Sequence, residues 1–232
     1  DLTDQFAMAQ YQSPPLSAPL VNKLIKRELG KEAPKIFDEF SPLAMRAASI
    51  GQVHRARYKG EEVAIKLQYP GVAESISSDL KLVKPFALKL LKLKSKEVKM
   101  YFTEVEKKML EETDYKQEMR QGIRIAESCK SLKGIRFPKY YPELSTDRLL
   151  VMEWLHGNHL DHFFDLDISQ EERNDIGQKL WDFYQYQMHE LKWLHADPHP
   201  GNFLINDKKE LAVIDFGCMK KVPHDFYLNY FM

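Results

Sequence analysis

The sequence has few cysteines, no long apolar segment and no excess of charge of either sign. Its two cysteines, Cys129 and Cys218, are too few for a disulfide framework and are typical of a reducing compartment. No apolar run approaches the roughly 18 residues that a membrane-spanning helix needs, and no signal-peptide pattern is present. Lys plus Arg and Asp plus Glu both number 34, so the overall charge gives no reason to expect nucleic acid as a ligand.

The 232 residues are enough for one large or two small domains, each with its own core. A hydrophobic content of 44% and a charged content of 29% are ordinary for a globular protein. The chain does not begin with Met and stops soon after an Asp-Phe-Gly tripeptide. We therefore expect it to be part of a longer polypeptide.

The most informative stretch contains two short apolar runs, Phe203–Ile205 and Leu211–Ile214, on either side of a polar turn. This pattern predicts a β-hairpin. A loop that carries Asp197 and Asn202 enters the hairpin, and Asp215 follows it. We expect these three side chains to lie close together.

These three residues match, in order and spacing, the catalytic-loop Asp, the metal-binding Asn and the Asp of Asp-Phe-Gly in protein kinases. Mg²⁺ prefers oxygen ligands and keeps several waters, so one carboxylate and one amide oxygen beside the phosphates of a nucleotide suit it. The alternative is three unrelated polar loop residues and a chance Asp-Phe-Gly.

Residues 52–58 and 62–67 predict a second hairpin, whose later strand contains Val63-Ala64-Ile65-Lys66. Lys66 matches the kinase lysine that binds the α- and β-phosphates of ATP, although most strand lysines are merely exposed. Kinases carry a glycine-rich loop before this hairpin. This chain instead has Ala47-Ala48-Ser49-Ile50-Gly51, which disfavours the positive φ that glycine allows.

The spacing of apolar residues predicts four helices. The first begins at the N-cap Ser17 and ends at Gly30, and the last opens with a capping box of Ser169 and Glu172. Between them lie a basic helix over 75–96, with a kink at Pro85, and one long helix over 97–130. The lysines of 81–99 fit either a solvated helix face or contact with anionic lipid headgroups.

Two further strands are expected over Arg136–Tyr140 and Arg148–Trp154. The second ends in an acidic residue and a short linker, where a kinase hinge would bind adenine through backbone groups; an ordinary sheet strand fits the pattern equally well. The hinge positions would be Met152, Glu153 and Trp154.

Four motifs together resemble the UbiB/AarF family of atypical protein-kinase-like proteins, which is tied to ubiquinone biosynthesis and lipid metabolism. The resemblance spans roughly residues 35–220, and the family's N-terminal Lys-x-Gly-Gln motif is absent from this sequence. The motifs are Ala47-Ala48-Ser49-Ile50-Gly51-Gln52-Val53-His54, Val63-Ala64-Ile65-Lys66 with Gln68-Tyr69-Pro70-Gly71-Val72, Glu112-Thr113-Asp114-Tyr115 through Glu118, and His195-Ala196-Asp197-Pro198-His199-Pro200-Gly201-Asn202 with Asp215-Phe216-Gly217.

The resemblance implies a role for each motif residue. Lys66 would pair with the ATP phosphates and with Glu118, and Asp197 would take the catalytic-base position. Asn202 and Asp215 would hold Mg²⁺. The remaining positions are the nucleotide loop of Ala47, Ala48 and Ser49, which is associated with altered nucleotide preference, and the regulatory Glu-x-Asp pair of Glu112 and Asp114.

The resemblance also implies an α+β, protein-kinase-like two-lobed fold, with an antiparallel sheet in the N-lobe, family-specific helices and a truncated helical C-lobe. We expect an N-terminal helical extension over 1–34, an N-lobe with inserted helices over 35–154 and a partial C-lobe over 155–232. The expected location is a reducing interior, cytoplasmic or mitochondrial in type, at the face of a membrane.

Three functions follow as hypotheses. The first is an Mg²⁺-dependent ATPase or kinase that uses ATP (or ADP as its bound nucleotide) in ubiquinone or other isoprenoid-lipid metabolism. The second is a nucleotide-gated module that binds a lipid or quinone intermediate or organises a complex, without protein kinase activity. The third is a small-molecule phosphotransferase of the aminoglycoside- or choline-kinase type, whose family lacks the Ala-Ser-Ile-Gly-Gln run.

Overall fold

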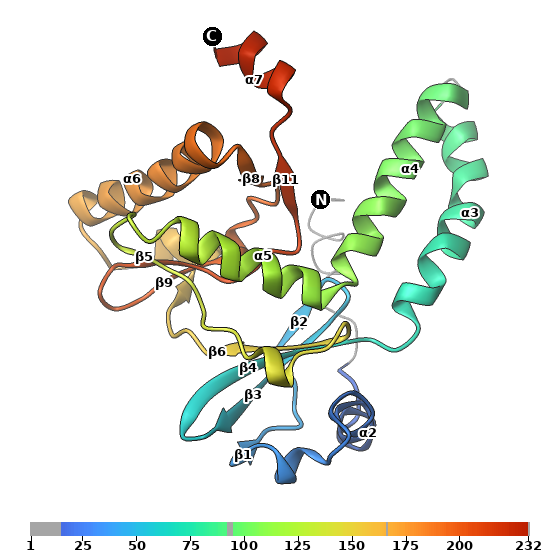
Figure 1. Cartoon of the computed structure of the whole chain (residues 1–232), viewed down its shortest axis with the longest axis vertical. Coiled ribbons are helices and arrows are strands. Elements are labelled where there is room, and N and C mark those ends of the chain that lie inside the picture. The colour runs from blue at the N-terminus through green and yellow to red at the C-terminus, as the bar shows by residue number, and fades with distance from the viewer. Residues whose placement is uncertain (1–14, 92–94, 166, 232) are drawn as a thin grey trace. The chain divides into compact units, whose positions relative to one another are not determined.

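The computed structural model describes residues 15–91, 95–165 and 167–231 (Figure 1). The chain forms two compact units, which are described separately here. The first contains the described residues up to Lys116 together with Tyr141–Met152; the second contains Gln117–Tyr140 and the residues from Glu153 onward. Helices and largely antiparallel sheets occur together in the chain, which confirms the predicted α+β class.

The first unit is built on a sheet with the strand order β1-β3-β4-β6, and β2 pairs with β3. Helical segments precede the sheet, and further helices follow β4. In chain order the elements are α2 (Ala18–Leu29), η1 (Ala33–Lys35), β1 (Glu39–Phe40), β2 (Arg46–Ala48), β3 (Gly51–Tyr58), β4 (Glu61–Gln68), α3 (Val72–Leu91), α4 (Ser95–Glu112), η2 (Pro142–Leu144) and β6 (Leu149–Glu153).

The helix predicted over residues 17–30 and the hairpin predicted from residues 52–58 and 62–67 are confirmed. Helix α2 buries Val21, Leu24 and Ile25 in a core that also contains the inward residues of β3, β4 and β6. It ends at Gly30 in the left-handed conformation, but the side chain of the N-cap Ser17 makes no capping hydrogen bond. Strands β3 and β4 pair antiparallel through a tight turn.

The basic helix also forms, starting earlier than predicted, at Val72. Figure 1 shows α3 and α4 as neighbouring helices, and a 2.6 Å hydrogen bond from Ser77 Oγ to Glu106 Oε1 joins them. Lys81 is exposed, whereas the side chains of the later lysines of this segment lie outside the described residues. No helix in the described part of the chain is long and apolar enough to cross a membrane.

The prediction of one long helix over 97–130 is wrong, because the chain breaks between Glu112 and Tyr115. Helix α4 ends at Glu112, and α5 (Tyr115–Ser128) starts anew. Two long-range hydrogen bonds hold the break: Gln68 Nε2 donates to the Thr113 carbonyl at 3.1 Å, and Tyr115 N–H donates to the Asp147 carbonyl at 3.0 Å. Tertiary partners therefore satisfy backbone groups that a continuous helix would have paired internally.

The second unit contains a four-stranded sheet in the order β5-β10-β9-β7 and a separate pair, β11-β8. Its core gathers Phe183, Phe203, Phe216 and other buried apolar residues. After α5 its elements are β5 (Ile135–Arg136), β7 (Asn158–His159), η3 (Leu160–Asp165), α6 (Gln170–Tyr186), the π turn η4 (Gln187–Leu191), β8 (Trp193–His195), η5 (Pro200–Asn202), β9 (Phe203–Ile205), β10 (Leu211–Val213), β11 (Met219–Lys221) and α7 (His224–Phe231).

In this unit the predicted capping box is confirmed, and one predicted strand is wrong in extent. The capping box of α6 forms as expected, since Ser169 and Glu172 exchange both hydrogen bonds. The strand predicted over Arg136–Tyr140 is wrong in extent: β5 covers only Ile135–Arg136 and pairs in parallel with β10. Pro138, which has no backbone N–H, lies where the predicted strand would have continued.

A buried polar relay ties the start of α2 to the sheet of the first unit. Gln52 Oε1 accepts the Leu16 N–H at 2.9 Å, and Gln52 Nε2 donates to His54 Nε2 at 2.7 Å. His54 Nδ1 then donates to the Ser41 carbonyl at 3.1 Å. Burial holds the pKa of His54 below its usual 6.5, which fits a neutral ring that accepts at one nitrogen and donates at the other.

We predict that this relay makes stability depend on pH. The folded pKa of His54 lies below the unfolded value near 6.5, so the unfolded chain binds more protons in that window. The contribution is complete above pH 6.5 and is lost as pH falls through the folded pKa. Thermal unfolding from pH 8 to pH 5 should show a smaller loss for His54→Asn than for wild type; equal slopes would contradict the assignment.

We also predict opposite effects for two glycine-to-alanine changes. A Cβ at Gly51 would lie 2.3 Å from the Leu67 carbonyl oxygen, whereas a Cβ at the helical Gly177 meets no atom within 4 Å. Gly51→Ala should lower the free energy of unfolding by about 1–3 kcal/mol. Gly177→Ala, the control, should raise it by about 0.5–1 kcal/mol. Denaturant unfolding measures both, and a neutral Gly51→Ala would refute the packing argument.

Candidate functional site

The second unit brings together three of the predicted site residues. Strands β9 and β10 pair antiparallel, as predicted, so the chain positions before and after the hairpin are adjacent. Ile214 N–H donates to the Asn202 carbonyl at 3.0 Å. Asn202 Nδ2 in turn donates to Asp197 Oδ2 at 2.8 Å and to the Asp197 carbonyl at 3.2 Å. Asp197, Asn202 and Asp215 therefore share one small region.

The chain segments that precede Asp197 and follow Asp215 form a two-stranded sheet. Strand β8, which leads into the Asp197 loop, pairs antiparallel with β11, which follows Asp-Phe-Gly, and His195 lies opposite Met219. One more backbone bond, 2.8 Å from Ala196 N–H to the Cys218 carbonyl, extends the pairing toward Asp197. The loop and the Asp-Phe-Gly segment are thus joined by backbone hydrogen bonds, which do not depend on side-chain rotamers.

His195 connects the same two segments from the inside. Its side chain is 1% exposed, and its Nε2 lies 2.7 Å from the Asp215 carbonyl oxygen. A carbonyl can only accept, so Nε2 carries the proton. The ring packs against Phe203 and Phe216, and Nδ1 has no hydrogen-bond partner among the described residues. An apolar core thus encloses the histidine on its other side.

Two carboxylates lie beside Gly217. Asp215 Oδ1 accepts the Gly217 N–H at 2.9 Å. A Cβ at Gly217 would lie 3.3 Å from Asp215 Oδ1 and 3.9 Å from Glu118 Oε2. Glu118 comes from the first turn of α5 and is 3% exposed. The structure thus places Glu118 next to Asp-Phe-Gly, and a Cβ at position 217 would be tight against Asp215 and in ordinary contact with Glu118.

The donor atoms of Asn202 and Asp215 fit a magnesium ion. The amide nitrogen of Asn202 is used on Asp197, which leaves its oxygen, the atom that coordinates Mg²⁺, outside that contact. Asp215 would contribute a carboxylate, whose Oδ1 accepts the Gly217 N–H. Within the described residues no group of three or more His, Cys, Asp or Glu could hold a metal. An ion on this pair would take its other ligands from water and phosphate.

Tyr184 adds a neutral hydroxyl near the catalytic loop. Burial, with smaller contributions from Asp197 and Cys218, raises the pKa of Tyr184 to about 12. The phenol therefore stays protonated over the whole physiological range. The tyrosine also packs edge-on against Phe183 in the core.

Lys66 is buried in the first unit. It lies on β4 opposite Val53, is 7% exposed, and its Nζ lies 5.6 Å from the centroid of the Tyr115 ring. A lysine at this depth is not the exposed strand lysine of the alternative interpretation, because burying an ammonium group requires compensating partners. The predicted pairing of Lys66 with Glu118 stays a prediction.

The alanine loop forms the narrow end of a hairpin. Ala47 and Ala48 lie on β2 and pair with Gln52 and Gly51 of β3, and Ser49 is exposed in the turn between the strands. Most of this segment is therefore fixed in a β-ladder, where a glycine-rich loop would be free to follow a phosphate group.

The Glu-x-Asp pair frames the helix break. Glu112 is the last residue of α4, and Asp114 lies between α4 and α5, with both side chains partly buried. Thr113 Oγ1 donates to the Leu110 carbonyl at 2.7 Å and closes the end of α4. The motif thus marks the position where α4 ends and α5 begins.

The predicted hinge lies at the end of β6. Met152 is the last residue of the first unit, and Glu153 and Trp154 belong to the second. Glu153 N–H donates to the Lys139 carbonyl at 2.7 Å, and its carboxylate pairs with Arg136 at 3.0 Å. Of its backbone groups, Glu153 therefore has only the carbonyl to offer a ligand.

The sequence analysis missed two polar residues that support the site. His159 Nδ1 donates to the Gly201 carbonyl at 2.9 Å. Gln187 is fully buried, and its Oε1 accepts the His195 N–H at 2.7 Å. The only signal for Gln187 was a polar residue among the inward apolar positions of α6, and His159 gave none.

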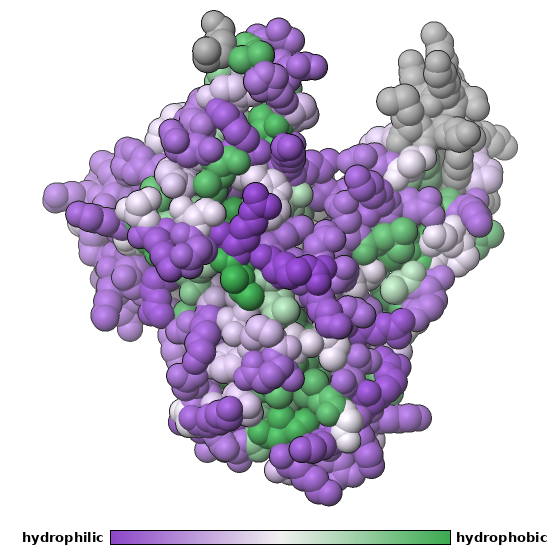
Figure 2. All heavy atoms as spheres, viewed as in Figure 1, coloured by the Kyte–Doolittle hydropathy of each residue, from purple (hydrophilic) through white to green (hydrophobic). Residues whose placement is uncertain are grey.

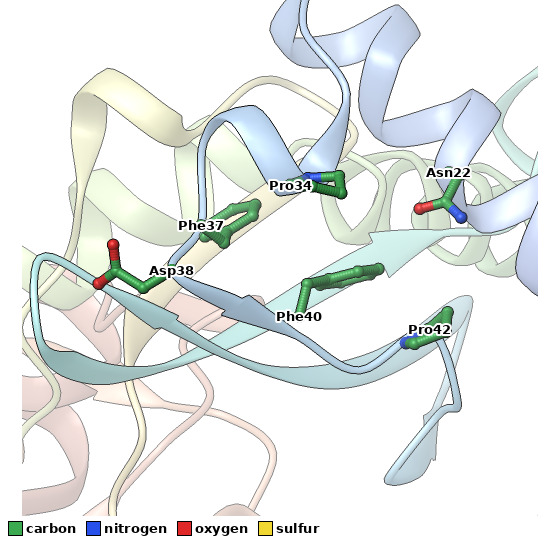
Figure 3. A pocket seen from close by; sticks show the side chains of 6 residues that line it. All are labelled: Asn22, Pro34, Phe37, Asp38, Phe40 and Pro42. Carbon is green, nitrogen blue, oxygen red and sulfur yellow. The ribbon is translucent and has the colours of Figure 1, made fainter.

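A hollow in the first unit lies elsewhere. It is lined by Phe37 and Phe40, with prolines and two polar residues at its edge (Figure 3). Figure 2 shows a hydrophobic patch in the same region, near β1 and α2, on a mostly hydrophilic surface. Asp38, at its rim, accepts the Gly60 N–H at 2.9 Å and so serves the β3–β4 turn. None of the predicted site residues lines this hollow.

Comparison with known proteins defines the class as kinase-like. The model of the ABC1 atypical kinase-like domain matches residues 8–232. A solved Mycobacterium tuberculosis structure, described as the complex of Rv3197 with erythromycin, superposes with a TM-score of 0.77 at 29% identity, covering 90% of this chain and 54% of that one. The α+β fold is therefore protein-kinase-like, as predicted.

The chain belongs to the ABC1 atypical kinase-like family, which confirms the UbiB/AarF resemblance. It is 33% identical to Arabidopsis thaliana protein ACTIVITY OF BC1 COMPLEX KINASE 8, chloroplastic, over 96% of this chain and 30% of that protein. It is 31% identical to AarF domain-containing protein kinase 1 of Xenopus tropicalis, over 99% of this chain and 45% of the relative. The chain thus spans less than half the length of these curated relatives.

We predict that His159 stabilises the loop that carries Asp197 and Asn202. His159→Phe removes the donor to the Gly201 carbonyl and should lower the free energy of unfolding by about 1 kcal/mol, the net value of one hydrogen bond. His162→Phe is the control, because the side chain of His162 is 62% exposed. Denaturant unfolding measures both variants; equal stability would show that the His159 bond contributes nothing.

Proposed function

We propose that this protein is an Mg²⁺- and ATP-dependent atypical kinase or ATPase of the UbiB type, linked to ubiquinone or another isoprenoid lipid. The grouping of Asp197, Asn202 and Asp215 in one compact unit is the observation that carries this proposal. Membership of the kinase-like family supports it. The lipid class rests on the family resemblance alone.

The roles of the residues follow from their chemistry. Asp197 would accept a hydrogen bond from the attacking hydroxyl or water and orient it toward the γ-phosphate. Asn202 holds Asp197 by its amide nitrogen and would give its amide oxygen to Mg²⁺, together with Asp215. The metal would neutralise negative charge on the phosphates when bound. Lys66 would bind the α- and β-phosphates. Glu118, which lies beside Gly217, would be the helix glutamate that pairs with this lysine.

The paired alanine hairpin favours a second candidate. Ala47 and Ala48 pair with β3, and alanine disfavours the positive φ that glycine allows, so this loop would approach a phosphate group less closely than a glycine-rich loop. A module that binds nucleotide tightly to control a lipid intermediate or a complex, without transferring phosphate to protein, would need no such loop. The Mycobacterium tuberculosis relative is described as a complex with erythromycin, which is not a nucleotide.

We predict that Asp197→Asn separates ATP turnover from ATP binding. Phosphate release should fall by at least about 10²-fold, because a positioned proton acceptor contributes about that much or more. ATP affinity should change less than about threefold, since the proposed contacts to the nucleotide lie elsewhere. Malachite-green assays and a fluorescent ATP analogue measure the two quantities in the full-length protein.

The exposed Asp207→Asn, in the β9–β10 turn, is the matched control and should leave both quantities unchanged. Unaltered turnover in Asp197→Asn would refute the catalytic assignment. Tight ATP binding without turnover in the wild type, with and without anionic vesicles, would favour the nucleotide-gated module.

A further inference from the structure

A glutamine at the end of α6 is among the most buried polar residues of the second unit. Gln187 is 0% exposed and begins the π turn η4. Its Nε2 donates to the Phe183 carbonyl at 3.2 Å, and its Oε1 accepts the His195 N–H at 2.7 Å. Because both ends of the amide have partners, its orientation is fixed, with the oxygen toward His195.

The π turn η4 connects α6 to β8. It ends at Lys192, which adopts the left-handed conformation with φ 52°, unfavourable for a residue with a Cβ. Wide turns of this kind often occur at functional sites. The Lys192 carbonyl accepts the Val222 N–H at 2.9 Å, and its Nζ lies 3.0 Å from the centroid of the Tyr227 ring. Contacts with the chain after Asp-Phe-Gly therefore compensate the strained residue.

Gln187 reaches the catalytic residues through one intermediate. It binds the backbone N–H of His195, and the ring of His195 donates from Nε2 to the Asp215 carbonyl at 2.7 Å. Asp197 follows His195 by two residues on the same strand and loop. A shift of Gln187 would move the start of the catalytic loop and would lengthen the His195–Asp215 bond.

We propose that Gln187 is a positioning residue that fixes the spacing between Asp197 and Asp215 by way of His195. The inference rests on the proposed function, in which these two acids act together on a nucleotide and its metal. Gln187 lies behind His195 and is not assigned any contact with the nucleotide. Its effect should therefore fall on the rate of the chemical step and on local protection of the loop.

The test compares Gln187→Met with Gln178→Met in the full-length protein. The first change removes both polar atoms and keeps the side-chain length. The second, on the same helix, replaces an exposed glutamine whose Nε2 donates to Asp182 at 2.7 Å. Hydrogen exchange of the His195 amide should rise about tenfold or more in Gln187→Met, because a buried N–H loses its acceptor. It should stay unchanged in Gln178→Met.

Kinetics provide the second measurement. The kcat for phosphate release should fall about tenfold or more in Gln187→Met, while the KM for ATP changes less than about twofold. Unchanged exchange at His195, an equal rise across all of α6 and β9, or a rise in KM alone would overturn the proposal. If wild-type protein shows no turnover, the proposed function fails, and the exchange measurement still decides whether Gln187 holds the loop.

A second variant covers the case in which Gln187→Met does not fold. Gln187→Glu has nearly the same shape, and because burial disfavours the charged carboxylate, the neutral acid keeps an acceptor oxygen for the His195 N–H and a hydroxyl donor for the Phe183 carbonyl. Protection of the His195 amide within about threefold of wild type, with kcat partly retained, would support the assigned bond. Loss of that protection in a folded Gln187→Glu protein would contradict it.

Discussion

The site depends on one buried hydrogen bond, from His195 Nε2 to the carbonyl of Asp215. It joins the loop that carries Asp197 to the segment that carries Asp215, and the β8–β11 pairing keeps the two in register from outside. Leaving a buried donor or acceptor without a partner costs free energy. Separating the two segments would therefore be unfavourable. Asn202, attached to both segments by its own hydrogen bonds, completes the arrangement.

The predicted site residues fall into two sets, one in each unit. The second unit contains the proposed metal-binding and catalytic residues together with Glu118. The first unit supplies Lys66 and the alanine hairpin, both fixed on the β2–β3–β4 ladder. Within that ladder, the Gln52–His54 relay ties the chain just before α2 to β3, the second strand of the alanine hairpin. In each unit, backbone strand pairing holds segments that carry predicted site residues or lead into them.

Features set by local sequence could be predicted, and features set by distant contacts could not. The hairpin β9–β10 and the capping box of α6 each depend on residues within ten positions of one another, so their patterns are visible in the chain. The break at Thr113 depends in part on Gln68, which is 45 residues away in the sequence. The π turn is similar, because its wide geometry is held by contacts with Val222 and Tyr227.

The same difference between local sequence and distant contacts applies to the candidate site. Asp197, Asn202 and Asp215 could be expected to meet because one short hairpin separates them. Gln187 and His159 could not be found, because their partners are backbone groups, and a backbone group leaves no trace in the sequence. Their side chains support the site from behind, and only the fold reveals them.

The most direct test of this account is the rate of phosphate release from ATP by the full-length protein as Mg²⁺ is titrated, for wild type and Asp215→Asn. The account predicts Mg²⁺-dependent turnover in the wild type, and a variant that needs much more Mg²⁺ or shows no turnover, because a metal-binding carboxylate has been removed. Turnover in Asp215→Asn with the Mg²⁺ dependence of the wild type would contradict it.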